Sequence, residues 1–447
     1  MKAFNTSYSS LIGIAFPLSL GAFAQFLVVL TDNYYLSKVS TVSINAAGNG
    51  GMLYLTAIML GVGLASGVQI FISRKQGEGV LEETGAWFGT GMRTALVMAL
   101  LLYGAYRYVD FRYLNGWYSD PELLATMREF MGVRFIGLFV YLPLLILNSF
   151  YIGIARTLML SVAMVLTSSV NVVLNYLLIF GNHGFPEMGV EGAAIASLSA
   201  EATGLVFMIL YTLTRKGNAP YKLWSGLFTK VQGFSRRLLK ISAPLMLQQT
   251  MGMGVWTVFY VLVARVGAEE LKVSHIVRNT YMLAFVCIMG FAFTTRTVVS
   301  TLIAEKRQEE LWGVMRKLML LNFAGVFLLC NGLIFFPYTI ASLFYEENEI
   351  SSISMLVKTF GVVFPAVLFF SITSILFNSI EGAGRTRIGL GIEIISIALY
   401  ITGVYQVTVA HPQPIHIIWM TEFIYFGSMG FFALLYLRFS NWKYTTI

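Results

Sequence analysis

A single carboxylate, Asp32, stands at the end of a long apolar run, after AFAQFLVVL and between Thr31 and Asn33. If this run crosses a lipid bilayer, a charged side chain facing lipid costs roughly 3 kcal/mol, so Asp32 is expected to face the protein interior. A carboxyl group held out of water can bind and release a proton or another small cation. The other interpretation is an interfacial aspartate that caps a helix end. The first interpretation makes Asp32 a candidate cation-coupling residue.

Two pairs of polar residues further along the chain have the spacing of one helical turn. They are Asn171 with Asn175, and Ser197 with Glu201. Residues four apart on a helix share one face, so each pair can present its oxygens together. These groups could coordinate Na⁺, which prefers several oxygen ligands, or hydrogen-bond a protonated Asp32. The alternative is hydrogen bonding between membrane helices, worth about 0.6 kcal/mol each.

The C-terminal half carries further charged residues inside apolar runs, among them Arg296, Glu393 and Glu422. Unpaired charges in a membrane segment are costly, so we expect Arg296 to form a buried pair with a carboxylate. Buried pairs are retained either as structural locks or for gating and substrate binding. The residues leave both roles open.

The composition requires a membrane protein. Of 447 residues, 57% are hydrophobic and 12% are charged, whereas soluble domains carry roughly 25% charged residues. The net charge of +8 comes from basic residues in short loops between apolar segments, as the positive-inside rule predicts, so nucleic acid is not an expected partner. Two scattered cysteines and four scattered histidines suggest no disulfide framework, metal site or cofactor.

Apolar segments of about 20 residues predict membrane-spanning helices. Twelve such segments lie near residues 11–36, 46–73, 88–108, 130–153, 158–180, 190–213, 240–265, 274–304, 315–340, 353–380, 386–406 and 416–438. The expected fold is an all-α polytopic membrane protein, whose first helix is retained rather than cleaved as a signal peptide.

The distribution of Lys and Arg predicts the orientation of the chain. The loops that face the cytoplasm if both termini are inside hold far more basic residues than the opposite loops, which include the acidic residues Glu346, Glu347 and Glu349. We therefore expect both termini to be cytoplasmic in a bacterial inner (plasma) membrane. The basic stretch 215–239 is then a cytoplasmic linker between lobes 1–214 and 240–447.

The two halves of the chain repeat one another. At a shift of 229 positions, the helix and charged loop beginning at Gly61 align with those beginning at Gly290, and GIART aligns with GAGRT. Six helices per repeat place both repeats in the same orientation, which predicts two pseudo-symmetric six-helix bundles with a cavity between them. Such a duplication suits alternating access.

The run SSVNVVLNYLLIFGNHGFPEMGVEGAAIASLSAE (168–201), the first helix with Asp32, and EGAGRTR together resemble the multidrug and toxic compound extrusion (MATE) transporters. The resemblance implies a V-shaped twelve-helix antiporter that exports organic cations or other amphipathic compounds in exchange for H⁺ or Na⁺. It maps Asp32, Asn171 and Ser197 onto the family's cation site, and Asn175 onto a position that is Asp in some members. Glu201 could replace the missing charge. From the residues themselves, GVEGAA predicts close helix packing.

The C-terminal half departs from one branch of that family, whose members carry an acid on the seventh helix. This chain has Gln248 and Gln249 there, followed by Trp256 and Tyr260. Aromatic rings can bind organic cations of varied structure through cation–π contacts, so these four residues are candidates for a substrate cavity. The alternative is ordinary packing of membrane helices.

Two other classes of function, a lipid flippase and a membrane enzyme, are alternatives to an exporter. A flippase for lipid-linked oligosaccharides or peptidoglycan precursors is the main alternative, although such a protein is expected to line its cavity with several basic groups. An enzyme is not expected, because the histidines have no acidic partner at motif spacing and no phosphate-binding GxxxxGK[ST] loop is present. We expect a monomer, with lipid and a small amphipathic substrate as its partners.

Overall fold

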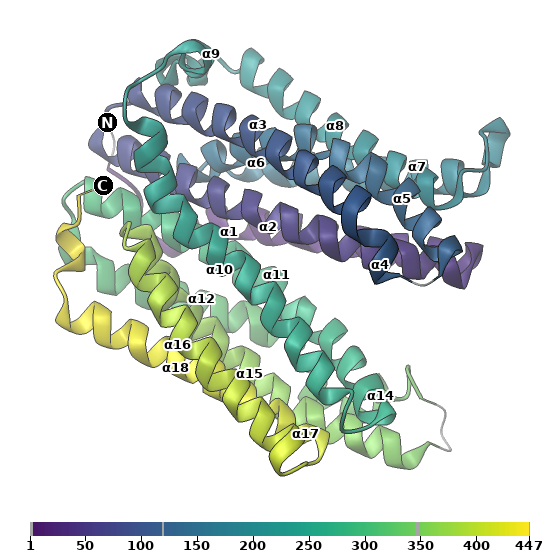
Figure 1. The fold of residues 1–447 in the computed structure, drawn as a ribbon. Coiled ribbons are helices and arrows are strands. Elements are labelled where there is room, and N and C mark those ends of the chain that lie inside the picture. The colour runs from purple at the N-terminus through teal and green to yellow at the C-terminus, as the bar shows by residue number, and fades with distance from the viewer. Residues whose placement is uncertain (1–2, 119, 346–348, 447) are drawn as a thin grey trace. The chain divides into compact units, whose positions relative to one another are not determined.

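The computed structural model describes residues 3–118, 120–345 and 349–446, so the expected outer-loop acids Glu346 and Glu347 lie outside the described residues. The described chain is built of helices with short turns between them, which confirms the all-α prediction (Figure 1). Its first half contains α1 (Tyr8–Val39), α2 (Thr41–Glu78), α3 (Glu83–Val109), α4 (Asn115–Trp117), α5 (Pro121–Ile136), α6 (Leu138–Gly153), α7 (Leu158–Phe180), α8 (Gly189–Thr214) and α9 (Leu223–Phe228). Its second half contains α10 (Phe234–Val263), α11 (Ala268–Ala304), α12 (Leu311–Cys330), α13 (Gly332–Phe335), α14 (Pro337–Ala341), α15 (Ile350–Gly382), α16 (Thr386–Tyr405), α17 (Ile415–Trp419) and α18 (Thr421–Phe439).

Ten helices of the described chain are long and apolar enough to cross a membrane, and the pair α5–α6 makes eleven if it forms one span. That pair is bent by 43° where the sequence predicts a single straight segment. The remaining expected segment is α10, a helix of 30 residues that is long enough to span but is not among the ten. Its two adjacent amides, Gln248 and Gln249, lower its apolar character.

The ninth expected segment ends earlier than predicted. It was expected to reach residue 340, but α12 ends at Cys330 and the short helices α13 and α14 follow. The side-chain amide of Asn331 donates to the Leu328 carbonyl oxygen at 2.7 Å and so competes with the helical backbone pattern. Pro337 begins α14, because proline lacks the N–H that a continuing helix needs.

The chain divides into two compact units. One consists of residues 20–246, and the other of residues 1–19 together with 247–447. Helices α1 and α10 each contribute to both units, and each carries a proline two residues before its division, Pro17 in α1 and Pro244 in α10. The divisions thus fall at corresponding places in the two repeats. The lobes 1–214 and 240–447 describe the repeat and remain a prediction.

In the unit of residues 20–246, α7 and α8 form the most extensive helix contact, and α2 packs against α5 and α6. Small residues permit these approaches. A Cβ built on Gly192 of α8 would lie 2.7 Å from the carbonyl oxygen of Leu178 in α7, so only glycine lets the backbones meet there. The GVEGAA run therefore has the packing role that its composition predicts.

In the other unit, α15 is the central helix: it contacts α11, α12 and α18, and α16 packs along α18. Figure 1 shows α16 and α18 running side by side. The core here is rich in aromatic side chains, including the fully buried Phe259, Tyr281 and Trp419. These rings surround the buried acids that are described below.

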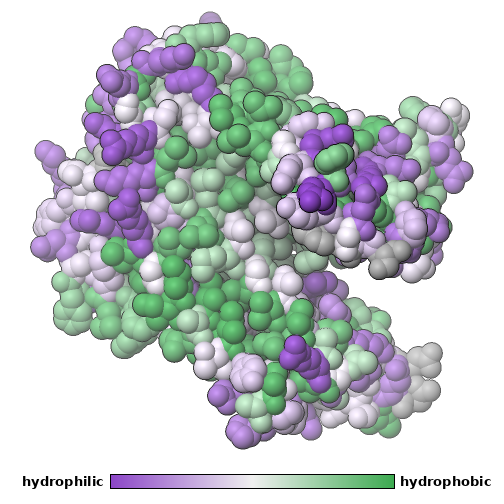
Figure 2. Space-filling model, in the orientation of Figure 1, coloured by the Kyte–Doolittle hydropathy of each residue, from purple (hydrophilic) through white to green (hydrophobic). Residues whose placement is uncertain are grey.

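The outer surface is apolar over broad areas. Figure 2 shows extended hydrophobic surface on the face it presents. Leu101 on α3 and Leu328 on α12, for example, leave 67% and 72% of their surface exposed. Patches of this extent are rare on soluble monomers and are the expected surface for contact with lipid.

Candidate functional site

Asp32 lies inside α1, which continues to Val39, so it does not cap the end of that helix. Its Oδ1 accepts a hydrogen bond from the side-chain amide of Asn175 on α7, with 2.5 Å between the two atoms. Asn175 is fully buried, whereas Asp32 is partly exposed. The carboxyl group therefore faces helix α7 while keeping some access to its surroundings.

Hydrogen bonds continue from Asp32 across two helices. The amide nitrogen of Asn175 also donates to Asn171 Oδ1 at 3.0 Å, one turn earlier on α7. Asn171 in turn donates to Ser197 Oγ on α8 at 3.2 Å. The one-turn spacing that the sequence shows thus places both amides on one face of α7, between α1 and α8.

Glu201, one turn beyond Ser197 on α8, pairs with an arginine. The guanidinium of Arg134 on α5 lies 2.9 Å from Glu201 Oε1, and both side chains are 11% exposed. The same guanidinium lies over the ring of Tyr54 on α2, 4.2 Å from the ring centroid, in the geometry of a cation–π contact. Arg134 and Glu201 both lie close enough to Asp32 to interact with it electrostatically.

The net charge of this cluster and its unpartnered acceptor oxygens suit a small cation. Asp32, Glu201 and Arg134 sum to one formal negative charge (−1 −1 +1) when all are ionised. Asn175 Oδ1 and Glu201 Oε2 are buried and have no hydrogen-bond partner in the described structure. Buried acceptors without partners are uncommon and call for a ligand, a proton or water. The cluster can therefore accept one positive charge.

Arg134 is the site residue that the sequence reasoning missed. It stands in the apolar run of the fourth segment, as VRFIGLF, and an arginine within a span is itself a signal of function or pairing. The five residues expected to bind the cation, by contrast, all lie in this one cluster: Asp32, Asn171, Asn175, Ser197 and Glu201.

A second buried ion pair lies on α11 and α15. Arg296 Nε lies 2.7 Å from Glu381 Oε2, and the side chains are 6% and 3% exposed. This confirms that Arg296 pairs with a carboxylate, although the sequence did not indicate which one. Gln248, with its amide oriented to suit both neighbours, donates to Glu381 Oε1 and accepts from the Leu390 N–H, each at 3.2 Å. The residue expected to line a substrate cavity thus supports the ion pair.

Glu393 and Glu422 meet tyrosines instead of arginine. The hydroxyls of Tyr400 and Tyr281 donate to the two oxygens of Glu422, at 2.8 and 3.1 Å. Tyr425 donates to Glu393 Oε1. Both glutamates are buried, and neither has a basic partner within salt-bridge distance in the part of the chain that is described.

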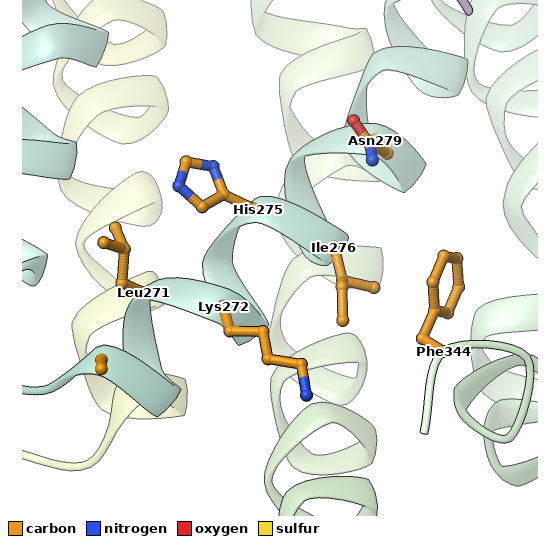
Figure 3. A pocket seen from close by; sticks show the side chains of 7 residues that line it. Leu271, Lys272, His275, Ile276, Asn279 and Phe344 are labelled. Atoms are coloured by element: carbon orange, nitrogen blue, oxygen red, sulfur yellow. The ribbon is translucent and has the colours of Figure 1, made fainter. Parts of the chain in front are cut away.

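The other cavity candidates belong to an aromatic cluster next to these acids. Trp256 stacks on Tyr260 with 6.0 Å between ring centroids, and Tyr260 stacks on His275 at 4.9 Å. Gln249 is partly buried and is not brought together with them by any described hydrogen bond. His275 lines an open cavity of about 470 Å³ along the first turns of α11, and Phe344 from another segment also lines it (Figure 3).

The fold and the polar cluster around Asp32 together define a class of protein. The chain is a polytopic helical membrane protein built from an internal repeat, and it holds a partly shielded carboxyl group among polar side chains of neighbouring helices. Ionisable residues held inside the membrane-spanning part of a protein mark ion or substrate pathways.

A family model described as MatE matches residues 17–177 and, a second time, residues 244–405. The two matches cover most of the chain and begin 227 positions apart (244 − 17), which confirms the internal repeat. The chain belongs to the MatE family, the group of transporters that the 168–201 run resembles.

Relatives in sequence are named as multidrug resistance proteins. A probable multidrug resistance protein NorM of Synechocystis is 22% identical over 75% of this chain and 73% of its own length. Another of the same name from Thermotoga maritima is 23% identical over 87% of this chain and 82% of its own length. These names describe transporters and not enzymes, in agreement with the expectation that the chain is no enzyme.

Solved structures share the fold. An outward-facing multidrug resistance MATE family transporter superposes with a TM-score of 0.88 at 18% identity, over 96% of this chain and 95% of its own. A MOP superfamily transporter from Pyrococcus furiosus gives 0.88 at 19% identity, over 98% of this chain and 97% of its own. The similarity extends over nearly the whole chain and confirms the MATE fold.

Proposed function

We propose that this protein is a secondary active antiporter. It exports organic cations or other amphipathic compounds in exchange for H⁺, or alternatively Na⁺, by alternating access, and Asp32 is its coupling carboxylate. The observation that carries the proposal is the short hydrogen bond between Asp32 and the buried Asn175, which ties a membrane carboxyl group to a polar network on α7 and α8.

The composition of the network favours H⁺ over Na⁺. The resemblance to MATE transporters maps Asn175 onto a position that is Asp in some members, so this cluster has one carboxylate fewer, and Glu201 is already paired with Arg134. A proton needs only the Asp32 carboxylate, whereas a hard metal cation needs several oxygens. Binding a proton removes the remaining negative charge, which allows the site to change its surroundings at low electrostatic cost.

The orientation of the chain is part of the proposal: both termini and the linker 215–239 face the cytoplasm, across the plasma (inner) membrane. In each unit, contacts between segments that are expected on the cytoplasmic side support this orientation. In one unit, Lys222 of the linker pairs with Glu82 of the α2–α3 loop at 2.7 Å. In the other, the backbone of Phe4 is bound by Glu305 and Arg307 of the α11–α12 loop.

The test is efflux by the full chain reconstituted in proteoliposomes, with a fluorescent organic cation as substrate. Asp32→Asn keeps the size and the helix but loses the ionisable group, so gradient-driven efflux should fall to the leak rate of empty liposomes. Asn33→Ala, at the exposed neighbouring position, is the matched control and should transport at the parent rate.

Transport at the parent rate by correctly inserted Asp32→Asn would remove Asp32 from the mechanism. Specific binding of a pyrophosphate-linked lipid, together with failure to bind the organic cation, would instead favour the flippase alternative. Both variants are compared at equal amounts of folded protein, judged by size-exclusion profiles.

A further inference from the structure

The acids Glu393 and Glu422 lie on the adjacent helices α16 and α18 of the unit that contains residues 247–447. They are 6% and 3% exposed, and the proposed mechanism does not use them. Burying a carboxylate with no positive partner is strongly unfavourable unless the group takes up a proton or is fully hydrogen-bonded. Their surroundings therefore need an explanation.

Tyrosine hydroxyls are the first part of that explanation. Glu422 receives one from Tyr400 and one from Tyr281, and Glu393 receives one from Tyr425. The rings of Tyr400 and Tyr425 lie 5.4 Å apart, which joins the two acids into one network. A tyrosine hydroxyl can donate to a carboxylate or, after rotation, accept from a carboxylic acid. The network can therefore hold its acids in either protonation state.

An unused acceptor lies on the same helix face. Tyr425 donates to Glu393 Oε1, and no hydrogen bond to Oε2 is found among the described residues. Ser396 is fully buried, and within the described part of the chain its hydroxyl has no hydrogen-bond partner. Ser396 stands three residues after Glu393 and four before Tyr400, so all three share one face of α16. A proton on Glu393 Oε2 would add a hydrogen-bond donor to the helix face that also carries Ser396.

The charged and titratable groups around the network come from five helices. They are Tyr260 of α10, His275, Arg278 and Tyr281 of α11, the Arg296–Glu381 pair of α11 and α15, Tyr400 of α16 and Tyr425 of α18. Arg278 and His275 contact the ring of Tyr260 and not the glutamates. Arg296 is engaged by Glu381. Trp419 of α17 also borders the network, and its ring packs against the ring of Tyr281.

We propose that Glu393 and Glu422, with Tyr281, Tyr400, Tyr425 and Ser396, form a second proton-binding site of this protein. A proton arriving on hydronium forms an O–H bond at Glu393 Oε2 and leaves water behind. Tyr425 keeps its hydrogen bond to Oε1, so loading requires no other bond to break. Loss of the proton to water reverses the step and restores the carboxylate.

The place of this site in transport rests on the proposed function, whereas proton binding itself does not. If the chain is a proton-coupled exporter, its two units each carry a protonatable carboxyl cluster, around Asp32 in one and around Glu393 and Glu422 in the other. The second site then allows a second proton to move per cycle.

The test is a pH titration of the purified full chain, followed by infrared absorption of the C=O stretch of protonated carboxyl groups. It is made in the Asp32→Asn background, so that Asp32 contributes no signal. We expect a band from buried carboxylic acid that grows as the pH falls and is lost in the double variant Glu393→Gln, Glu422→Gln. Glu309→Gln, which changes an exposed glutamate of the same unit, should leave that band intact.

A single-hydroxyl variant guards against a folding defect. Tyr425→Phe keeps the ring but removes the donor to Glu393, so it should move the midpoint of the band without abolishing it. Tryptophan emission offers a second readout, because Trp256 and Trp419 lie 5.2 and 6.1 Å from the ring of Tyr281.

An unchanged pH difference spectrum in the folded double variant would overturn the proposal. So would a spectral change that follows added Na⁺ at constant pH in place of the pH itself. Neither outcome bears on Asp32, whose role is decided by efflux of Asp32→Asn; the two proposals can fail separately.

Discussion

At the scale of single residues, the site around Asp32 is organised by the side-chain amide of Asn175, which donates hydrogen bonds to two acceptors. Asn175 donates its amide hydrogens to both Asp32 and Asn171, and its own carbonyl oxygen is buried with no hydrogen-bond partner among the described residues. An amide in this position holds the carboxyl group in place and adds no charge of its own. This arrangement fixes the orientation of the Asp32 carboxyl group and still allows it to bind a proton.

The pair Arg134–Glu201 gives a prediction about stability. Removing one member leaves the other charge buried, so Arg134→Met should lower the free energy of unfolding by about 3–5 kcal/mol. The double variant Arg134→Met, Glu201→Leu leaves neither charge and should be markedly more stable than either single variant. Thermal unfolding in detergent measures the effect.

The exposed pair Lys222–Glu82 provides the control. Its side chains are 55% and 67% exposed, and Glu82→Gln should change stability by less than about 1 kcal/mol. If the double variant at Arg134 and Glu201 loses as much stability as the two single variants added together, the pair does not act as a unit and this account of it is wrong.

Residue types indicated the polar cluster around Asp32 better than they indicated which residues form ion pairs. Asp32, Asn171 and Ser197 could be found because a polar side chain in an apolar run has few purposes. Arg134 also stands in an apolar run and could have been found in the same way. Which residues pair, Arg134 with Glu201 and Arg296 with Glu381, required tertiary information, since the partners lie on helices far apart in the sequence. The tyrosines around Glu422 gave no signal, because tyrosine is common in membrane helices.

At the scale of elements, the linker is held by close contact with a membrane helix. Helix α9 packs on α3, and Arg93 of α3 donates to the carbonyl oxygens of Leu227 and Thr229 at 2.5 and 2.9 Å, satisfying the last turn of α9. A Cβ on Gly85 would lie 2.5 Å from the Tyr221 carbonyl oxygen and 2.8 Å from the carbonyl carbon of Lys222. The backbones meet there because Gly85 has no side chain.

Gly85→Ala should therefore push the linker away from α3 and cost about 1–3 kcal/mol of stability, as overpacking does. Gly104 on the same helix is the matched control, because a Cβ there would meet nothing within 4 Å. Gly104→Ala should be neutral or stabilise the helix by about 0.5–1 kcal/mol. Limited proteolysis of the linker together with thermal unfolding would test both; equal behaviour of the two variants would contradict the packing argument.

The lengths of the apolar segments do not predict where helices bend or end. Hydropathy located the spanning segments, but it cannot detect a bend such as the 43° angle between α5 and α6. It also cannot tell that the apolar stretch after Cys330 leaves the helix, because Asn331 and Pro337 act through hydrogen bonds and not through hydropathy. Helix existence was predictable, whereas helix ends and bends depended on single residues.

At the scale of the whole molecule, the duplication is the main organising feature. The family model matches both halves, and α1 and α10 divide between the two contact units at corresponding prolines. The two repeats have nevertheless acquired different chemistry: one carries Asp32 among amides, and the other carries glutamates among tyrosines. The sequence showed the repeat, but only the structure separated these two polar networks.

The central claim is that a cation bound at Asp32 drives export, and gradient exchange in proteoliposomes tests it most directly. Efflux of a cationic dye is measured under a pH gradient without Na⁺, and then under a Na⁺ gradient at uniform pH, for the parent and for Asp32→Asn. The account predicts efflux by the parent under the pH gradient, little under Na⁺ alone, and none above leak in the variant. Equal efflux by parent and variant under the pH gradient would contradict it.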